Sequence, residues 1–473
     1  MKRKWGSQAR LLVLLLGVLA LTRVPYAKAT VPGPTFDYSH DGQTLDYTGA
    51  YLFRVSPVAD AEGYLWGFFQ NGVLIWENSR DEGHLSSNEY GIWPDSTAHD
   101  KFSVGDVKVW VRAWVNDEWT DATIITIHLR YLVPVLILAY YPPDPSNPTY
   151  LDPVETGWSS ILITDMQTAT QGMIEAGQAL INDATRYHGY KDPRAPQYLE
   201  YYTYEKIEYF YPMPRGYHLG GTQYRPHYNQ ILNNIDICDY VDNHNVKEVW
   251  IYGYHASIIV PDESKMSSRY GDVSNAHPKD EYIPEEYRLP RCTNSYVMYN
   301  FTYQPGGALA IGNNIHNRMH QIENVIFFAE DLGYPPDDSN VIGSLFWDDF
   351  SVYVNRASLP GYRASCGNTH SPPNTTEEYD YDSTQYRENN CETWHPDDSL
   401  TTYVTANCTQ WGCTDVGFYK WFMQNLPGYN NGIVHDGRQM RNWWEAMYDF
   451  NGFIDGGRSL FVTHFVYLPL VVR

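Results

Sequence analysis

The stretch Val133-Pro134-Val135-Leu136-Ile137-Leu138-Ala139-Tyr140-Tyr141 is an unbroken apolar run that predicts a β-strand at the start of a new domain. The pattern after it predicts a helix over 164–186, an aromatic strand over 198–211, a helix over 228–243 and a strand over 246–254. Strands that alternate with helices favour an α/β domain with a partly parallel sheet. We therefore expect an α/β catalytic domain over residues 131–473, with long disulfide-stabilised loops.

The region before this run, residues 30–130, has the pattern of an all-β sandwich. Val107 to Val115 alternates apolar and polar residues, and Asn71-Gly72 is typical of a hairpin turn. Residues 53–64 and 109–113 resemble a fibronectin type III or related immunoglobulin-like module. That resemblance implies a spacer or binding accessory, so we assign no chemistry to this region.

Residues 1–29 have the features of a signal peptide. Basic residues stand at positions 2, 3, 4 and 10, an apolar run covers 11–21, and Ala27-Lys28-Ala29 is typical of a cleavage site. The apolar run is too short to span a bilayer, and no later run is longer. We expect a secreted, extracellular protein that is cleaved near Ala29 and has no membrane span.

The formal charge argues against a nucleic-acid partner. It is −23, and removal of residues 1–29, which carry six basic and no acidic residues, changes it to −29. Proteins bind nucleic acids mainly through Lys and Arg contacts to phosphate. The acidic chain instead suits an extracellular polymer, peptide or glycan, or a cell-surface component as partner, and it is compatible with bound calcium.

The six cysteines predict disulfides. An even number in an exported chain favours paired thiols over a catalytic cysteine. Cys408 and Cys413 are close enough in sequence for a local loop, and Cys366 with Cys391 is a second candidate pair. Cys238 and Cys292 are the remaining disulfide candidates.

The sharpest chemical pattern is His316-Asn317-Arg318-Met319-His320-Gln321-Ile322-Glu323. On a helix, positions i, i+4 and i+7 lie on one face, so His316, His320 and Glu323 would form a row. Two imidazoles and a carboxylate suit zinc or another divalent transition metal. Asn317 stands where the zincin motif has its glutamate, so the motif is different. Alternatively, these side chains hydrogen-bond to tyrosines.

Further candidates lie beyond the strand that ends at Tyr254. His255 follows it directly, and Glu263 lies where a general base is expected, because ligands bind beyond the carboxyl ends of strands. For Asp262 we expect a solvated loop acid.

A second loop, Cys366 to Asn374, contains two prolines and a candidate disulfide, which would hold His370 rigidly. Asp380 and Asp382 would share one side of an extended segment. They are candidates for binding calcium or for supporting His370, and a structural turn is the alternative.

Residues 263–266, 316–323, 366–374 with 380–382, and 421–427 resemble segments of a group of uncharacterised secreted microbial proteins. The resemblance implies that these pieces belong to one domain. It implies no reaction.

Three functions are consistent with these residues. The first is a secreted metal-dependent hydrolase of peptide or glycan, with His316, His320 and Glu323 on the metal, Glu263 as general base and His370 completing the site. The second is a metal-free glycoside hydrolase that uses Glu263 and Glu323 as paired carboxylates. The third is a non-catalytic carbohydrate-binding or surface protein.

Overall fold

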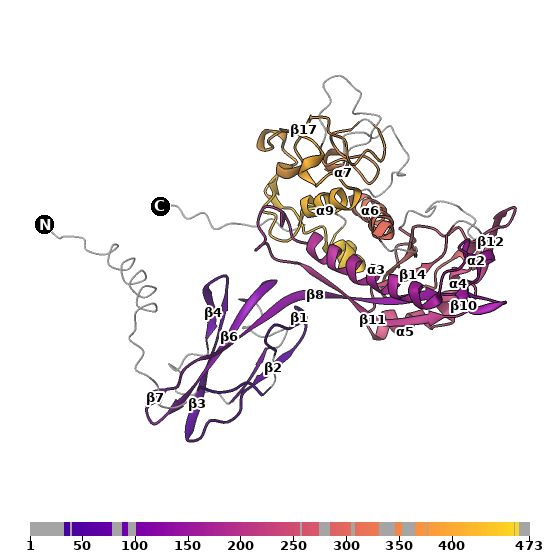
Figure 1. Cartoon of the computed structure of the whole chain (residues 1–473). Helices are drawn as coiled ribbons and strands as arrows, with labels where there is room; N and C mark the ends of the chain where they lie inside the picture. Colours follow the sequence, from indigo (N-terminus) through magenta and orange to yellow (C-terminus); the bar gives the residue numbers. More distant parts are fainter. Residues whose placement is uncertain are drawn as a thin grey trace. The chain divides into compact units, whose positions relative to one another are not determined.

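The computed structural model describes residues 33–37, 40–77, 88–92, 101–255, 258–273, 284–303, 308–330, 346–351, 365–375, 377–457 and 459–462. The chain divides into two compact units, residues 1–129 and 130–473 (Figure 1). The predicted signal peptide lies outside the described residues. Among the helices that are described, none has the length and apolarity that crossing a membrane requires.

Unit 1 is built from strands. They are β1 (Thr44–Asp46), β2 (Tyr51–Arg54), β3 (Ala61–Gln70), β4 (Val73–Glu77), β5 (Glu89–Ile92), β6 (Gly105–Val115), β7 (Glu118–Trp119) and the first part of β8 (Thr123–Tyr140). Strands β4, β3, β6 and β8 pair in this order, and β2 pairs with β5. The alternation in β6 buries Val107, Val109 and Val111 in a core shared with Phe53 of β2. The described part of unit 1 has no α-helix, as the sequence predicts.

The predicted turn at Asn71-Gly72 joins β3 and β4. Both residues have positive φ, 52° and 77°, which is the conformation that a two-residue hairpin turn with right-handed strand twist requires.

Strand β8 corrects one expectation from the sequence. The sequence predicts a strand that begins at Val133, at the start of a new domain, but one strand runs from Thr123 to Tyr140. The residues just before Val133, which are Arg130, Tyr131 and Leu132, include no turn-forming residue, so nothing interrupts the extended backbone. Through β8, hydrogen bonds join ten strands into one mixed sheet.

The sheet of unit 2 is partly parallel, as predicted. Strands β11 (Leu199–Tyr209) and β14 (Glu248–Gly253) both pair parallel with β8, and β16 (Tyr296–Thr302) pairs parallel with β14. Strand β15 (Ser264–Ser267) adds antiparallel to β16. Every residue of β14 is buried, which explains why this segment is apolar without alternation.

Three long helices pack against one another in unit 2: α3 (Ile163–Ala184), α6 (Ala308–Glu330) and α9 (Asp415–Asn425) (Figure 1). Helix α3 contacts β11, and α6 contacts β15 and β16. The predicted helix over 228–243 is instead two helices, α4 (Tyr228–Asn233) and α5 (Ile237–Asn243). The break falls at Asp236, whose φ of 51° is incompatible with a continuous right-handed helix.

The remaining elements are short. They are α2 (Pro153–Thr156), α7 (Phe346–Phe350), α10 (Glu445–Tyr448), α11 (Phe450–Asp455), β9 (Pro143–Asp144), β10 (Asn147–Leu151), β12 (Arg215–Gly220), β13 (Gln223–Pro226), β17 (Arg387–Asn389), β18 (Val404–Ala406), β19 (Val434–His435) and β20 (Arg438–Gln439), with 3-10 turns at 285–287, 391–393, 398–400 and 408–410.

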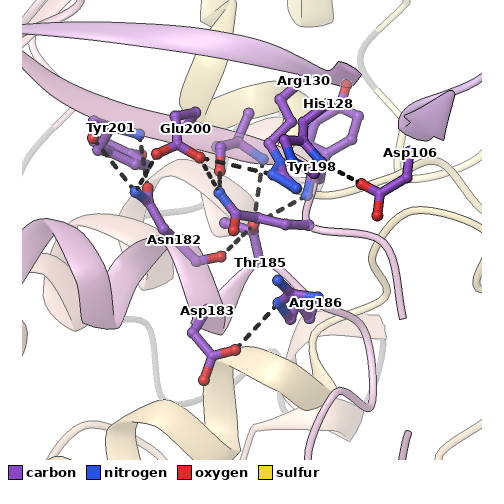
Figure 2. Close-up of polar contacts among 12 residues, drawn as sticks. Asp106, His128, Arg130, Asn182, Asp183, Thr185, Arg186, Tyr198, Glu200 and Tyr201 are labelled. Atoms are coloured by element: carbon purple, nitrogen blue, oxygen red, sulfur yellow. Dashed lines mark hydrogen bonds and ion pairs between the residues drawn. The ribbon is translucent and has the colours of Figure 1, made fainter. Parts of the chain in front are cut away.

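The end of α3 is joined to the edge strand β11 by side chains (Figure 2). The Asn182 side chain accepts from Tyr201 N at 2.7 Å and donates to Tyr201 O at 3.4 Å, as a neighbouring strand would. Thr185 Oγ1 accepts from the amides of Tyr198 and Leu199, both at 3.2 Å. These bonds satisfy backbone groups at the open edge of the sheet.

A buried ion pair sets the rotation of α6. Arg318 and Glu248 of β14 are both fully buried, with Nη1 2.8 Å from Oε1 and a second bond from Nη2 to Oε2. The guanidinium also lies 4.5 Å from the Tyr299 ring centroid. Arg318 is two positions from both His316 and His320, about 200° around the helix. The histidines therefore lie on the face of α6 away from the sheet.

All six cysteines form disulfides. Cys366 pairs with Cys391 and Cys408 with Cys413, as predicted, and Cys238 pairs with Cys292. The Cys366–Cys391 bridge holds the start of the loop that carries His370.

Candidate metal centre

Three histidines from two segments meet beside α6. His316 and His320 come from the helix and His370 from the loop after Cys366, and one nitrogen of each lies within 4.8 Å of the others. In the part of the chain that the structure describes, this is the one group of three or more His, Cys, Asp or Glu donors with metal-binding spacing. No acidic group there has such spacing for calcium.

The closest pair of imidazoles is at hydrogen-bond distance, slightly closer than two ligands of one metal ion. His320 Nε2 lies 2.9 Å from His370 Nε2. Two nitrogens on a tetrahedral zinc ion would be about 3.3 Å apart. A small outward movement of either ring would therefore admit an ion.

A chain of hydroxyl groups decides which nitrogen of His316 carries its proton. Tyr381 Oη donates to Thr369 O at 2.8 Å, so its contact with Tyr419 Oη, also 2.8 Å, must use the proton of Tyr419. Tyr419 Oη is then the acceptor for His316 Nδ1, at 3.1 Å. This arrangement leaves the lone pair on His316 Nε2, the nitrogen available to a metal.

Glu323 is turned toward the other ring nitrogen of His320. Its Oε2 accepts from His320 Nδ1 at 3.1 Å, and its Oε1 accepts from Thr369 N at 2.8 Å. Desolvation opposes its charge, but these bonds prevail and lower the pKa of Glu323. In return they raise the pKa of His320 against its own desolvation. Glu323 thus orients His320 and ties the His370 loop to α6.

The backbone of the loop explains its composition. Gly367 has φ of 81°, and a Cβ there would lie 2.1 Å from Ser371 O. Asn368 Oδ1 accepts from His370 N at 2.9 Å. The His370 ring stacks on His316, with centroids 5.2 Å apart and planes at 17°. Desolvation, followed by the neighbouring imidazoles, lowers the pKa of His370.

Glu263 lies near the Nε2 atoms of the two helical histidines, opposite the Nδ1 atoms that bond to Tyr419 and Glu323. Its Oε1 lies 3.6 Å from His316 Nε2 and its Oε2 lies 3.8 Å from His320 Nε2, while the side chain is 37% exposed. Its neighbour Asp262 is not the solvated acid expected from the sequence. It is buried, and Oδ1 lies 3.4 Å from Arg225 Nη1, because a buried carboxylate requires a cationic partner.

The remaining candidates from the sequence lie outside the group of three histidines. His255 is exposed at the end of β14; desolvation and Arg225 lower its pKa, and Glu263 acts in the opposite direction. Asp380 and Asp382 do not share a side of an extended segment, because the chain turns there. Asp380 Oδ2 accepts from Thr375 Oγ1 at 3.1 Å, and Asp382 is exposed.

The sequence offered hydrogen bonds from the histidines to tyrosines as an alternative, and His316 makes one with Tyr419, but the sequence did not identify which tyrosines. In Tyr379-Asp380-Tyr381-Asp382 it selected the acids, whereas Tyr381 bonds to the loop and Tyr379 lies against His370, with ring centroids 4.7 Å apart. Tyr419 lies on α9, a helix in which the sequence offered no candidate site residue.

Comparisons with known proteins give limited similarity. No protein-family model and no curated protein match the chain. A fibronectin type III-like protein from Clostridium thermocellum has 12% identity over 22% of this chain and 95% of its own, with a TM-score of 0.15. Fibronectin(III)-like modules of CbhA from that organism have 12% identity over 23% of this chain and 56% of their own, at 0.16.

A polysaccharide deacetylase from Bacillus cereus has 6% identity, over 47% of this chain and 60% of its own, with a TM-score of 0.17. At TM-scores this low, function has to be argued from the site itself.

Proposed function

We propose that this protein is a metal-dependent hydrolase in which His316, His320 and His370 hold a divalent transition metal. The carrying observation is the 2.9 Å separation of His320 Nε2 and His370 Nε2, combined with Nδ1 atoms of His316 and His320 that already have partners. In this proposal His370 is the third ligand. Glu323, which the sequence suggested as a ligand, instead orients His320 from behind.

The donor set fits zinc. Three imidazoles, two of which have hydrogen-bonded outer nitrogens, together with a position left for water suit a catalytic zinc site. An ion held there would lower the pKa of a coordinated water and polarise a substrate carbonyl.

Glu263 supplies the proton transfer. Its carboxylate lies within 3.8 Å of the nitrogens of both helical histidines, and it is partly exposed on the side from which a substrate can approach. A carboxylate in this position takes a proton from the attacking water and returns it to the leaving group.

The glycoside hydrolase with paired carboxylates is less well supported. Glu263 contacts Nε2 of His320 and Glu323 contacts Nδ1, so the imidazole ring lies between the two acids. No sugar fits between them. Both oxygens of Glu323 also have partners, and its lowered pKa opposes a role as general acid.

The structural alternative is a metal-free cluster in a binding protein. His320 would then carry two protons, one toward Glu323 and one toward His370, and both of its ring nitrogens would have partners. Metal content separates this alternative from the hydrolase. Export with cleavage near Ala29 stays a prediction, although the three disulfides suit an oxidising compartment.

The test measures metal in the purified protein by elemental mass spectrometry, beside His316→Ala/His320→Ala and His370→Ala. We expect about one equivalent of zinc or another transition metal, lost in both variants. Chelation should also lower the melting temperature of the wild type but not of the variants. His218→Ala, at an exposed histidine of β12, is the matched control and should keep its metal. A folded wild type that takes up no supplied metal would refute the proposal.

A further inference from the structure

We propose that the substrate is an acylated glycan and that Tyr379 is the platform on which its sugar ring stacks; the inference rests on the metal-dependent hydrolase proposed above. Tyr379 is 55% exposed, although its ring belongs to the histidine cluster. Its centroid lies 4.7 Å from that of His370 and 6.2 Å from that of His316, with the plane at 22° to His316. One part of the ring is packed on the cluster, and the rest faces solvent.

The backbone holds this ring in place. Tyr379 has φ of 62°, a left-handed conformation that is unfavourable for a bulky residue. Its amide donates to His370 O at 2.6 Å, which compensates part of that cost. A large aromatic side chain kept exposed on a strained backbone indicates a binding role rather than core packing.

Tyr379 and Glu263 border the same open side of the cluster. Both lie beside His316: the Tyr379 ring centroid is 6.2 Å from that of His316, and Glu263 Oε1 is 3.6 Å from His316 Nε2. A substrate ring on Tyr379 would therefore have its substituents within reach of Glu263.

A sugar explains this platform better than a peptide does. The flat face of an aromatic ring packs on the C–H face of a pyranose, while an extended peptide is typically held by an open strand edge. The strand nearest Glu263 is β15, and the amide of Met266 on its unpaired edge already donates to Asp272 Oδ1 at 2.9 Å. That edge is not open to a substrate strand at this position.

The scissile bond is then an acyl bond on the sugar. Glycosidic cleavage commonly uses two carboxylates, and Glu323 is not available as the second. In acyl hydrolysis, the oxygen of water adds to the carbonyl carbon, and the bond from that carbon to the nitrogen or oxygen of the sugar breaks. Glu263 passes the water proton to the leaving amine or alcohol, and the acyl group leaves as a carboxylic acid.

The experiment compares acetate release from N-acetylated chitooligosaccharides and O-acetylated xylo-oligosaccharides with hydrolysis of p-nitrophenyl acetate, which lacks a sugar ring. We expect turnover of at least one oligosaccharide by the metal-loaded protein. In Tyr379→Ala, kcat/KM for the oligosaccharide should fall about tenfold more than that for p-nitrophenyl acetate. Tyr379→Phe should keep the wild-type ratio, because it retains the ring. Tyr386→Ala, at a tyrosine that is 70% exposed, is the control and should change neither.

The outcomes separate the two proposals. A protein that binds metal and cleaves p-nitrophenyl acetate but neither oligosaccharide, or that cleaves peptides instead, overturns the acylated-glycan inference and leaves the hydrolase standing. Equal losses on both substrates in Tyr379→Ala, or a loss in Tyr379→Phe as large as in Tyr379→Ala, overturn the stacking role. A folded protein without metal overturns the proposed hydrolase and this inference together.

Discussion

The two faces of α6 differ in how their ionisable side chains are buried and paired. The inner face buries Arg318 against Glu248, with bidentate geometry and aromatic rings around the guanidinium. The outer face presents His316 and His320, which are only partly buried and meet His370 and Glu263. A fully paired charge fixes the helix, while the cluster of imidazoles is the proposed metal site. Each face can be tested by a change that leaves the other intact.

The largest effect should come from the inner face. Glu248→Ala leaves the Arg318 guanidinium buried without its carboxylate, and we expect a loss of about 3–5 kcal/mol in the free energy of unfolding. Chemical denaturation measures it. The double variant Glu248→Leu/Arg318→Met should recover much of this loss, because no buried charge remains. A loss below about 1 kcal/mol in Glu248→Ala would show that the pair does not anchor the helix.

The outer face should respond in metal affinity rather than in stability. His370→Ala removes one ligand, so we expect zinc affinity to fall at least about 100-fold, read by competition with a chromophoric chelator. Without metal, the His370→Ala variant should unfold at nearly the same denaturant midpoint as the metal-free wild type. Unchanged affinity would exclude His370 from the ligand set.

Substitution of the residues that hydrogen-bond to the Nδ1 atoms of His316 and His320 should have smaller effects on zinc affinity. Glu323→Gln keeps an acceptor for Thr369 N but loses the charge beside His320, and Tyr419→Phe removes the acceptor for His316 Nδ1. We expect each to weaken zinc binding about 10-fold to 100-fold. The same chelator competition gives the values. Stronger loss in Tyr419→Phe than in His370→Ala would contradict the assignment of roles.

A histidine outside α6 gives the smallest effect and a useful contrast. Desolvation, followed by Lys191, lowers the pKa of His188 to about 4. Below about pH 6.5, His188 therefore binds a proton in the unfolded chain but stays neutral in the folded protein. The free energy of unfolding should consequently fall by about 1–2 kcal/mol as the pH drops from 6.5 to 4.5. Urea denaturation at the two pH values measures the slope. His188→Gln should reduce it, and an unchanged slope would refute this assignment.

Local patterns predicted several elements well. The alternation in β6, the turn at Asn71-Gly72, the helix around His316 and the Cys408–Cys413 pair were predictable because each depends on residues close in sequence. The predicted pair Cys366–Cys391 spans 25 residues and is also confirmed. Boundaries were predicted less well. The continuity of β8 and the break at Asp236 depend on pairing partners and on one backbone angle, which a local pattern does not contain.

The candidate site follows the same division. Sequence spacing alone placed His316, His320 and Glu323 on one face of a helix, since helical periodicity is a local property. Which side chains turn toward one another was decided by the tertiary structure. It brings His370 to the helix across 50 residues and turns Glu323 to the far nitrogen of His320. It also places the Tyr379 ring and the Glu263 carboxylate beside His316, because these contacts depend on packing between distant segments.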